Sequence, residues 1–252
     1  MSGPAEASQT GEPGLDLALV MPVYNEAGGA AATVRAWLAV LADLGLAGRL
    51  VIIDDGSTDA TPAELAPLAG DPRCLVLRQA NRGHGPAILR GYALAVRLAP
   101  WVFQCDSDNE IDSRHFPLLW ARRHGQAAVF GVRRGRGQTV GRRVISLVSR
   151  LTVRLAFGRA VADVNTPFRL LRSAELAALL PQIPPHVFAP NVIIAAALAR
   201  ARCPVLNLPV PHTGRPGPPP RLRLRFLKGA LRAFYQTLAY RPRLTGCGGE
   251  RS

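Results

Sequence analysis

Two acidic side chains separated by one residue, Asp106 and Asp108, directly follow an apolar run near the middle of the chain. Two carboxylates this close repel each other, and a divalent cation relieves that repulsion. Mg²⁺ and Mn²⁺ prefer oxygen ligands and leave coordination positions for substrate phosphates. Glu110 and Asp112 could add further oxygen ligands or contact an attacking group. The alternative is a solvated acidic turn that caps a helix starting near Ser113, and the spacing alone does not decide between them.

A second polar cluster, Asp54-Asp55-Gly56-Ser57, also follows an apolar run. Asp55, together with Asp54, could accept hydrogen bonds from a nucleobase or a ribose. The alternative is an ordinary loop in which Asp and Ser cap a helix and the glycine makes the turn. Either interpretation fits the residues on their own.

Tyr24 and Glu26 form a third cluster, at the end of the first apolar run. The tyrosine could stack on a base, and the glutamate could reach a ribose. An aromatic side chain that merely covers the end of a strand would look the same in the sequence.

A fourth cluster, Asn81–Gly85, is rich in glycine, which lets backbone approach a ligand closely. Arg82 and His84 could contact phosphate or sugar groups. A histidine in a glycine-rich loop is also commonly incidental, so this cluster too is ambiguous by itself.

The elements that carry these clusters alternate between strand and helix. Continuous apolar runs predict four buried strands, at Leu17–Val23, Leu50–Ile53, Cys74–Leu77 and Trp101–Cys105. Helical patterns separate them, ending near residues 44, 70 and 98, and Thr58 and Asp59 can cap the second of these helices. Short connections of this kind predict right-handed βαβ units in a parallel sheet. Ligands bind at the carboxyl ends of such strands, and all four clusters lie there.

The remaining chain is less regular. We expect a strand at 127–132, a basic amphipathic segment at 142–157, helices at 173–180 and 188–200, and a strand at 205–210. The predicted organisation is a disordered tail at 1–16, one α/β domain at 17–215, a proline-rich linker at 216–220, a basic amphipathic helix at 221–240 and a disordered tail at 241–252.

The charge of the chain is strongly positive, at +14, and all but one of its basic side chains are arginines, the exception being Lys228. The basic residues concentrate at 133–159 and 215–243, which suits phosphate-bearing ligands, anionic lipid or nucleic acid. Within 221–240, apolar residues recur at helical spacing, so this segment could lie on an anionic membrane surface or pack on the core of the protein.

The four cysteines are scattered, without the spacing of a zinc site. We therefore expect no disulfide framework and a reducing compartment, with Cys74, Cys105 and Cys203 serving as small buried apolar residues. No apolar run is long enough to span a membrane, and the first residues do not read as a secretory signal, so we expect a cytoplasmic protein.

In their order and spacing, the four clusters resemble those of the inverting glycosyltransferases of family 2, which have the GT-A fold. The stretches are PVYNE, IIDDGSTD, NRGHGPAILRG and QCDSDNE. Among these enzymes the chain is most similar to the dolichyl-phosphate or polyprenyl-phosphate mannosyl- and glucosyltransferases, over about residues 17–215. The resemblance implies a three-layer, Rossmann-like α/β fold with a mostly parallel sheet, Mg²⁺ or Mn²⁺, a GDP- or UDP-linked sugar donor and a polyprenyl-phosphate acceptor at the membrane.

The resemblance also implies roles for individual residues. Donor-nucleoside contacts fall on Pro22, Tyr24, Glu26, Asp54 and Asp55, with Arg82 nearby, and metal contacts fall on Asp106, Asp108 and Glu110. Contacts with donor or acceptor phosphates fall on Arg133, on Arg142 or Arg143, and on Arg215, while Asp163 and Arg169 match a later D-x-x-x-x-F-R pattern. A lipid phosphate would attack without a general base. A hydroxyl acceptor would need one, either Asp163 or Asp112.

Two positions depart from that branch. Pro167 stands where the branch usually has glycine before Phe-Arg, and Pro218-Pro219-Pro220 replaces a usual Ser and Lys. Both lie toward the acceptor side, so they bear on which acceptor is used. A soluble sugar or protein acceptor, a non-catalytic nucleotide-sugar binder and a basic nucleic-acid-binding protein are the alternatives. The sparse aromatic residues and the absence of any nucleic-acid-binding motif count against the last of these.

Overall fold

A computed structural model describes residues 14–134 and 166–211 together with residues 235, 236, 239, 240, 243, 244 and 247. The predictions for Arg142, Arg143, Asp163 and Arg215, and for most of 221–240, fall outside the described residues. Within the described residues, no helix is both long and apolar enough to cross a membrane.

Seven strands form one sheet. They are β1 (Leu17–Val23), β2 (Gly48–Asp54), β3 (Cys74–Arg78), β4 (Trp101–Gln104), β5 (Ala128–Arg134), β6 (Arg169–Arg172) and β7 (Val205–Pro211). Their order across the sheet is β3-β2-β1-β4-β6-β5-β7. All neighbouring pairs are parallel except the two that involve β6. The expectation of a mostly parallel sheet is confirmed.

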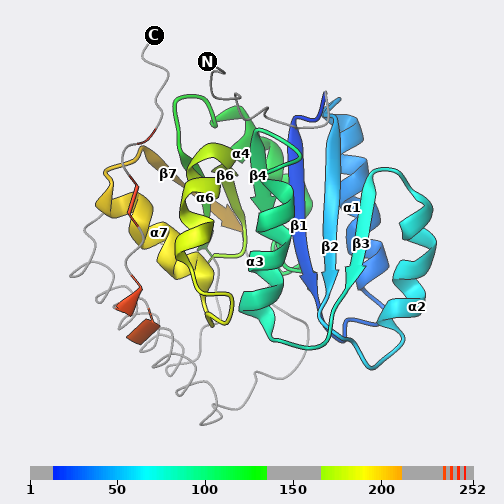
Figure 1. The fold of residues 1–252 in the computed structure, drawn as a ribbon. Coiled ribbons are helices and arrows are strands. Elements are labelled where there is room, and N and C mark those ends of the chain that lie inside the picture. The colour runs from blue at the N-terminus through cyan, green and yellow to red at the C-terminus, as the bar shows by residue number, and fades with distance from the viewer. Residues whose placement is uncertain are drawn as a thin grey trace, which may run out of the picture.

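Helices cover both faces of this sheet (Figure 1). They are α1 (Ala30–Asp43), α2 (Thr61–Leu65), α3 (His84–Ala95), α4 (Phe116–Ala121), α6 (Ser173–Leu179) and α7 (Pro190–Arg200), with 3₁₀ turns at Ala66–Gly70, Ser113–His115 and Leu180–Gln182. Helices α3, α6 and α7 pack on one face, and α1, α2 and α4 pack on the other. The fold therefore has the three layers predicted from the sequence.

The strands are buried on both sides, which explains their continuous apolar sequences. In β1, Ala18 and Val20 face the core beneath α3, while Leu17, Leu19 and Met21 face the core beneath α1. All seven residues of this strand are buried. A strand enclosed in this way has no polar face, so alternation is absent from its sequence.

An aromatic cluster fills the core on the α1 side of the sheet. The ring of Phe103 lies 4.8 Å from the ring of Phe116 and 4.8 Å from that of Phe168, each in an edge-to-face arrangement. Trp37 of α1 lies 5.1 Å from the Phe103 ring. These rings join α1, β4, α4 and the start of β6 into one packed unit.

The strand β6 was not predicted. It has four residues with an arginine at each end, so neither its length nor an apolar run distinguishes it in the sequence. It runs antiparallel between β4 and β5, pairing Gln104 with Arg169. Its first residues therefore lie at the edge of the sheet where the parallel strands end.

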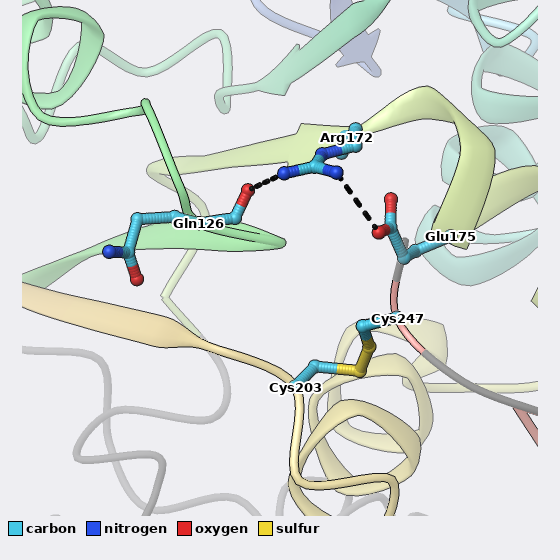
Figure 2. The surroundings of a disulfide bond; sticks show 5 residues. All are labelled: Gln126, Arg172, Glu175, Cys203 and Cys247. Carbon is cyan, nitrogen blue, oxygen red and sulfur yellow. Dashed lines mark hydrogen bonds and ion pairs between the residues drawn. A yellow bond between two sulfur atoms is a disulfide. The ribbon is translucent and has the colours of Figure 1, made fainter. Parts of the chain in front are cut away.

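One expectation about the cysteines is wrong. Cys74 and Cys105 are buried and free, as predicted, but Cys203 forms a disulfide with Cys247. The bond joins the turn between α7 and β7 to the C-terminal residues, as Figure 2 shows. Because the two cysteines are 44 residues apart in the sequence, their spacing gave no sign of this pairing.

An ion pair between a partly exposed arginine and a buried glutamate lies in the same region (Figure 2). Arg172 donates a hydrogen bond to the carbonyl of Gln126 at 2.9 Å and lies 3.7 Å from the carboxylate of Glu175. Burial raises the pKa of the Glu175 carboxyl group above its ordinary value. This pair lies at the junction of β6 and α6, away from the carboxyl ends of β1, β2 and β4.

Candidate active site

The predicted clusters gather at one edge of the sheet, where β1, β2 and β4 end. Val23 at the end of β1 is in register with Asp54 at the end of β2. The backbone N–H of Cys105, just past β4, donates to the carbonyl of Val20. Tyr24, Asp55 and Asp106 each follow these positions by one residue, so the sheet register alone brings them to the same edge.

The loop after β1 is held by side chains from the loop after β2 and from the helix α2 that follows it. Its four consecutive backbone N–H groups, at residues 25–28, each donate to a different side chain at 2.7–3.1 Å. The acceptors are Ser57, Thr61, Asp59 and Glu64. These amides are engaged within the protein, so this loop can contact a ligand mainly through its side chains. Tyr24, whose side chain is 47% exposed, offers a face for stacking.

The prediction that Thr58 caps the helix α2 is wrong. The helix begins at Thr61 and its N-cap residue is Ala60. The backbone N–H of Thr58 instead donates to the side chain of Asn25, in the loop after β1. Asp59 does accept a hydrogen bond from the N–H of Thr61. Residues predicted to serve the helix therefore also tie two loops of the site together.

Asp55 has a structural contact that the sequence did not predict. Its buried carboxylate accepts hydrogen bonds from the backbone N–H groups of Arg82 at 3.0 Å and Gly83 at 2.8 Å. It also accepts one from the side chain of Gln79 at 2.7 Å. Asp55 therefore fixes the glycine-rich loop in place, and its contact with a nucleoside stays a prediction.

Asp54 is buried and serves its own loop. One carboxylate oxygen accepts a hydrogen bond from the N–H of Ser57 at 2.8 Å, and the other lies 3.3 Å from Nε of Arg78. The side chain is 3% exposed. This geometry favours the structural interpretation for Asp54 over a direct contact with a ligand.

The glycine-rich loop leads directly into α3. Gly83, the N-cap residue, has a φ of 96°, which a residue with a side chain rarely adopts. His84, the first residue of the helix, places Nε2 at 3.7 Å from Oδ1 of Asp106. The predicted loop and the predicted acidic pair are therefore brought together.

The acidic pair itself occupies the turn after β4. Oδ1 of Asp106 accepts a hydrogen bond from the side chain of Gln104 at 3.1 Å, and Oδ1 of Asp108 accepts one from the N–H of Glu110 at 3.2 Å. Ser107, between the two acids, is tied to α1 because its carbonyl accepts a hydrogen bond from the hydroxyl of Thr33.

The residues present fit a cation that is shared with a substrate. Within residues 14–134 and 166–211, no three or more His, Cys, Asp or Glu side chains are close enough to hold a metal ion. Mg²⁺ commonly takes only one or two carboxylates from the protein and completes its shell with water and phosphate oxygens. Asp106 and Asp108 suit that arrangement, and Glu110 as a third ligand stays a prediction.

A hollow beside this turn brings two of the predicted clusters together. It has a volume of about 520 Å³ and is lined by Glu26, Gly29, Ala32, Thr33, Ala36, Ser107, Asp108 and Asn109. Its size is within the range of small-molecule sites. Glu26 and Asp108, predicted from separate motifs, line the same hollow.

Asp112 is a weak candidate for a general base. Its carboxylate accepts hydrogen bonds from the N–H of Arg114 at 2.9 Å and from the guanidinium of the same residue at 2.6 Å and 2.9 Å. The hydrogen bond from the Arg114 side chain is the main reason why the pKa of Asp112 lies below its ordinary value. A carboxylate stabilised in this way accepts a proton less readily.

Arg169 is buried within the protein. It donates from Nε to the carbonyl of Thr166 at 2.9 Å and from Nη1 to the carbonyl of Asn191 at 3.0 Å, and it stacks over the ring of Phe130. The arginine of the later sequence pattern therefore anchors the start of β6 to the start of α7.

Arg133 is the penultimate residue of β5 and lies at the same edge of the sheet as the acidic pair. Because β5 and β7 are parallel and β6 is antiparallel to β5, Arg134, Thr166 and Pro211 also lie at or near that edge. Arg142, Asp163 and Arg215 are outside the described residues, and their phosphate or catalytic roles stay predictions.

A three-layer fold with an acidic pair and nucleotide-suited clusters at the carboxyl edge of a mostly parallel sheet defines the GT-A class of glycosyltransferases. The chain belongs to glycosyltransferase family 2, since the family described as "Glycosyl transferase family 2" matches residues 18–174. The family expected from the four motifs is thereby confirmed.

Curated relatives carry a more specific description. The chain is 28% identical over 204 residues to the undecaprenyl-phosphate 4-deoxy-4-formamido-L-arabinose transferase of Pectobacterium carotovorum, covering 79% of this chain and 60% of the relative. It is 30% identical over 192 residues to the same transferase of Pseudomonas aeruginosa, covering 74% of this chain and 55% of the relative. The chain thus spans about 60% or less of the length of these relatives.

Solved structures share the fold. Glucosyl-3-phosphoglycerate synthase from Mycobacterium tuberculosis, in complex with Mn²⁺, UDP and phosphoglyceric acid, has a TM-score of 0.69 at 20% identity, covering 92% of this chain and 80% of that one. Its complex with Mn²⁺, UDP and glucosyl-3-phosphoglycerate has a TM-score of 0.67 at 19% identity, covering 92% of this chain and 81% of that one. The predicted GT-A fold is confirmed.

Proposed function

We propose that this protein transfers a sugar from a UDP- or GDP-linked donor onto a polyprenyl phosphate, with inversion at the anomeric carbon. The observation that carries the proposal is the meeting of Tyr24, Asp55 and the Asp106–Asp108 pair at one edge of the sheet in a family 2 chain. The names of the curated relatives support the polyprenyl-phosphate acceptor.

The donor would lie across this edge. Tyr24 would stack on the base, Glu26 would reach the ribose, and the loop that Asp55 holds would approach the nucleotide with its backbone. Asp106 and Asp108 would hold a divalent cation on the diphosphate. When bound, Mg²⁺ or Mn²⁺ neutralises negative charge on the leaving diphosphate. The Mn²⁺ in the complexes of the Mycobacterium tuberculosis enzyme supports a divalent ion.

A lipid-phosphate acceptor, which needs no general base, agrees with the hydrogen bonding of Asp112. A phosphate oxygen is already anionic at neutral pH, so its attack needs positioning more than proton removal. Asp112, bound by Arg114, is poorly suited to remove a proton. The phosphate contacts proposed for Arg133, Arg142 and Arg215, and a catalytic role for Asp163, rest on the sequence resemblance.

The acceptor would require the protein to work at a membrane surface, at its cytoplasmic face. The basic segment 221–240 is the proposed contact with anionic lipid. The alternative acceptor is a soluble sugar, glycan or protein, which the same donor site would serve. No nucleic-acid partner is proposed.

A transfer assay tests the proposal. The purified protein is incubated with radiolabelled UDP- and GDP-sugars and Mn²⁺, with and without undecaprenyl phosphate, and then extracted into organic solvent. We expect label in the organic phase only when the lipid is present. Label that stays in water in every reaction would contradict the lipid acceptor.

Two variants separate the metal site from general damage. Asp108→Asn removes a proposed cation ligand and should lower transfer by at least about 100-fold. Asp71→Asn changes a carboxylate that is bound by Arg73 away from this edge and should leave transfer unchanged. Equal transfer by the parent protein and Asp108→Asn would contradict the metal assignment.

A further inference from the structure

A continuous chain of hydrogen bonds runs from the core of the protein to the acidic pair. The hydroxyl of Tyr92 in α3 donates to the side-chain oxygen of Asn191 in α7 at 2.9 Å. The amide nitrogen of Asn191 donates to the side-chain oxygen of Gln104 in β4 at 3.0 Å. The amide nitrogen of Gln104 donates to Oδ1 of Asp106 at 3.1 Å. Residues of α3, β4 and the distant α7 thus connect to one carboxylate.

The three donors of this chain are buried. Tyr92 and Gln104 are 0% exposed, and Asn191 is 4% exposed. A buried amide left without a partner is costly, so each member depends on the next for its hydrogen bond. The chain therefore has little freedom to rearrange.

The two ends of the chain set its direction. Burial raises the pKa of the Tyr92 phenol well above its ordinary value, so this group keeps its proton and can donate. At the other end, Oδ1 of Asp106 accepts the hydrogen bond from the side chain of Gln104. Both amides between them must then turn their oxygens toward Tyr92 and their nitrogens toward Asp106. The amide of Gln104 is therefore held from both sides, by the carboxylate of Asp106 within the site and by Asn191 in the core.

The far end of the chain is anchored. Asn191 is the second residue of α7, and its backbone carbonyl accepts a hydrogen bond from the buried guanidinium of Arg169 at 3.0 Å. That guanidinium is also bonded to the carbonyl of Thr166, at the entrance to β6. The position of Asn191 is consequently held by its own helix, α7, and by Arg169 at the start of β6.

We propose that Gln104 and Asn191 are positioning residues that fix the carboxylate of Asp106 for a divalent cation. Gln104 and His84 both approach Oδ1 of this carboxylate, which assigns Oδ2 to the cation. The inference rests on the proposed function, and it adds two residues that act through Asp106 without touching the cation. Partners that orient a metal ligand in this way typically change metal affinity by about 10- to 100-fold when removed.

Direct binding of Mn²⁺ tests this inference without relying on turnover. The full-length protein is titrated with Mn²⁺ in the presence of UDP, and free Mn²⁺ is followed by electron paramagnetic resonance. We expect Gln104→Leu to raise the dissociation constant of Mn²⁺ by about tenfold. Tyr92→Phe, which changes nothing in contact with Asp106, should raise it by a smaller factor, about two- to threefold.

A matched control separates positioning from loss of stability. Ser173→Ala also removes a buried hydroxyl, which donates to the carbonyl of Ala99 before the start of β4, at the opposite end of that strand. It should lower the melting temperature without changing the affinity for Mn²⁺. Circular dichroism melting of every variant shows whether it is folded, and if Gln104→Leu does not fold, Tyr92→Phe decides the question.

The possible results are distinguishable. If the parent binds Mn²⁺ and both Gln104→Leu and Tyr92→Phe bind it equally well, the positioning role is wrong while the metal site stands. If Ser173→Ala weakens Mn²⁺ binding as much as they do, the effect is general and the positioning role is again wrong. If the parent and Asp108→Asn bind Mn²⁺ equally, the metal site and this inference both fail, and the transfer assay decides the proposed function separately.

Discussion

Replacing Asp55 by asparagine should destabilise the protein through the loop that this carboxylate holds. One oxygen of Asp55 accepts from Gln79 and from the N–H of Arg82, and the other accepts from the N–H of Gly83. Asparagine has only one oxygen. Its NH₂ group would therefore face a backbone N–H, which would be left buried without an acceptor.

The size of the effect follows from the burial of the site. Asp55 is 3% exposed, and a hydrogen bond to a buried charged group contributes about 1.5–3 kcal/mol. We expect the free energy of unfolding to fall by about 2–3 kcal/mol. The affinity for UDP should fall as well, because the loop of Arg82 and Gly83 would lose its anchor.

Asp71→Asn is the control for this experiment. The carboxylate of Asp71 also accepts from three N–H groups, all of Arg73, but that arginine side chain is 53% exposed. Water replaces lost hydrogen bonds at such a site, so its loss should cost less than about 1 kcal/mol. The comparison matches the number of donors and differs in burial.

Urea denaturation followed by circular dichroism gives the free energies of unfolding, and calorimetric titration gives the affinity for UDP. Equal and small losses of stability for Asp55→Asn and Asp71→Asn would refute the loop-anchoring argument. Unchanged stability with lost affinity for UDP would show that Asp55 acts on the nucleotide alone.

Three further substitutions probe the packing that supports the site. Gly85→Ala should cost about 1–3 kcal/mol in urea denaturation, because its Cβ would lie 2.7 Å from the carbonyl oxygen of Phe188; Gly70→Ala, with nothing within 4 Å, should be close to neutral. Cys247→Ser should lower the melting temperature of the oxidised protein. For a separation of 44 residues, the corresponding loss in the free energy of unfolding is at most about 4 kcal/mol. Reductant should lower the melting temperature of the parent protein to that of the variant. Arg169→Lys should cost at least about 2 kcal/mol in urea denaturation, since lysine cannot reproduce the buried forked contacts, and a loss below about 0.5 kcal/mol would contradict that role.

The sequence predicted the half of the fold that consists of strand–helix repeats. The strand at Leu17–Val23 was placed to the residue, and β2, β3 and β4 were each placed to within two residues at either end. Buried parallel strands are continuous apolar runs, and that local signal is strong. The glycine-rich stretch Asn81–Gly85 was expected to be a loop, but α3 already begins within it at His84, directly after the left-handed Gly83.

What the sequence did not predict depends on contacts between distant segments. β6 is a strand because β4 and β5 lie on either side of it. The disulfide joins cysteines in two separate elements, so spacing could not reveal it.

In the candidate site, too, the local motifs were predicted and the contacts between distant residues were not. Motif order brought Tyr24, Asp55 and Asp106 to one edge, and the structure places them there. The contact of Asp55 with the glycine-rich loop could not be predicted, since it spans 27 residues. Gln104 and Asn191 are 87 residues apart, and a single glutamine in a strand carries no sign of its partner.

The reversed direction of β6 has a consequence for how such a protein can change over evolution. Arg134 ends β5 and Thr166 lies just before β6, and both lie toward the same edge of the sheet because β5 and β6 are antiparallel. Any stretch of sequence inserted between them only has to close a loop, whose entropic cost rises slowly with length. A change in length between these two points would therefore leave the pairing of β1 with β2 and β4 as it is.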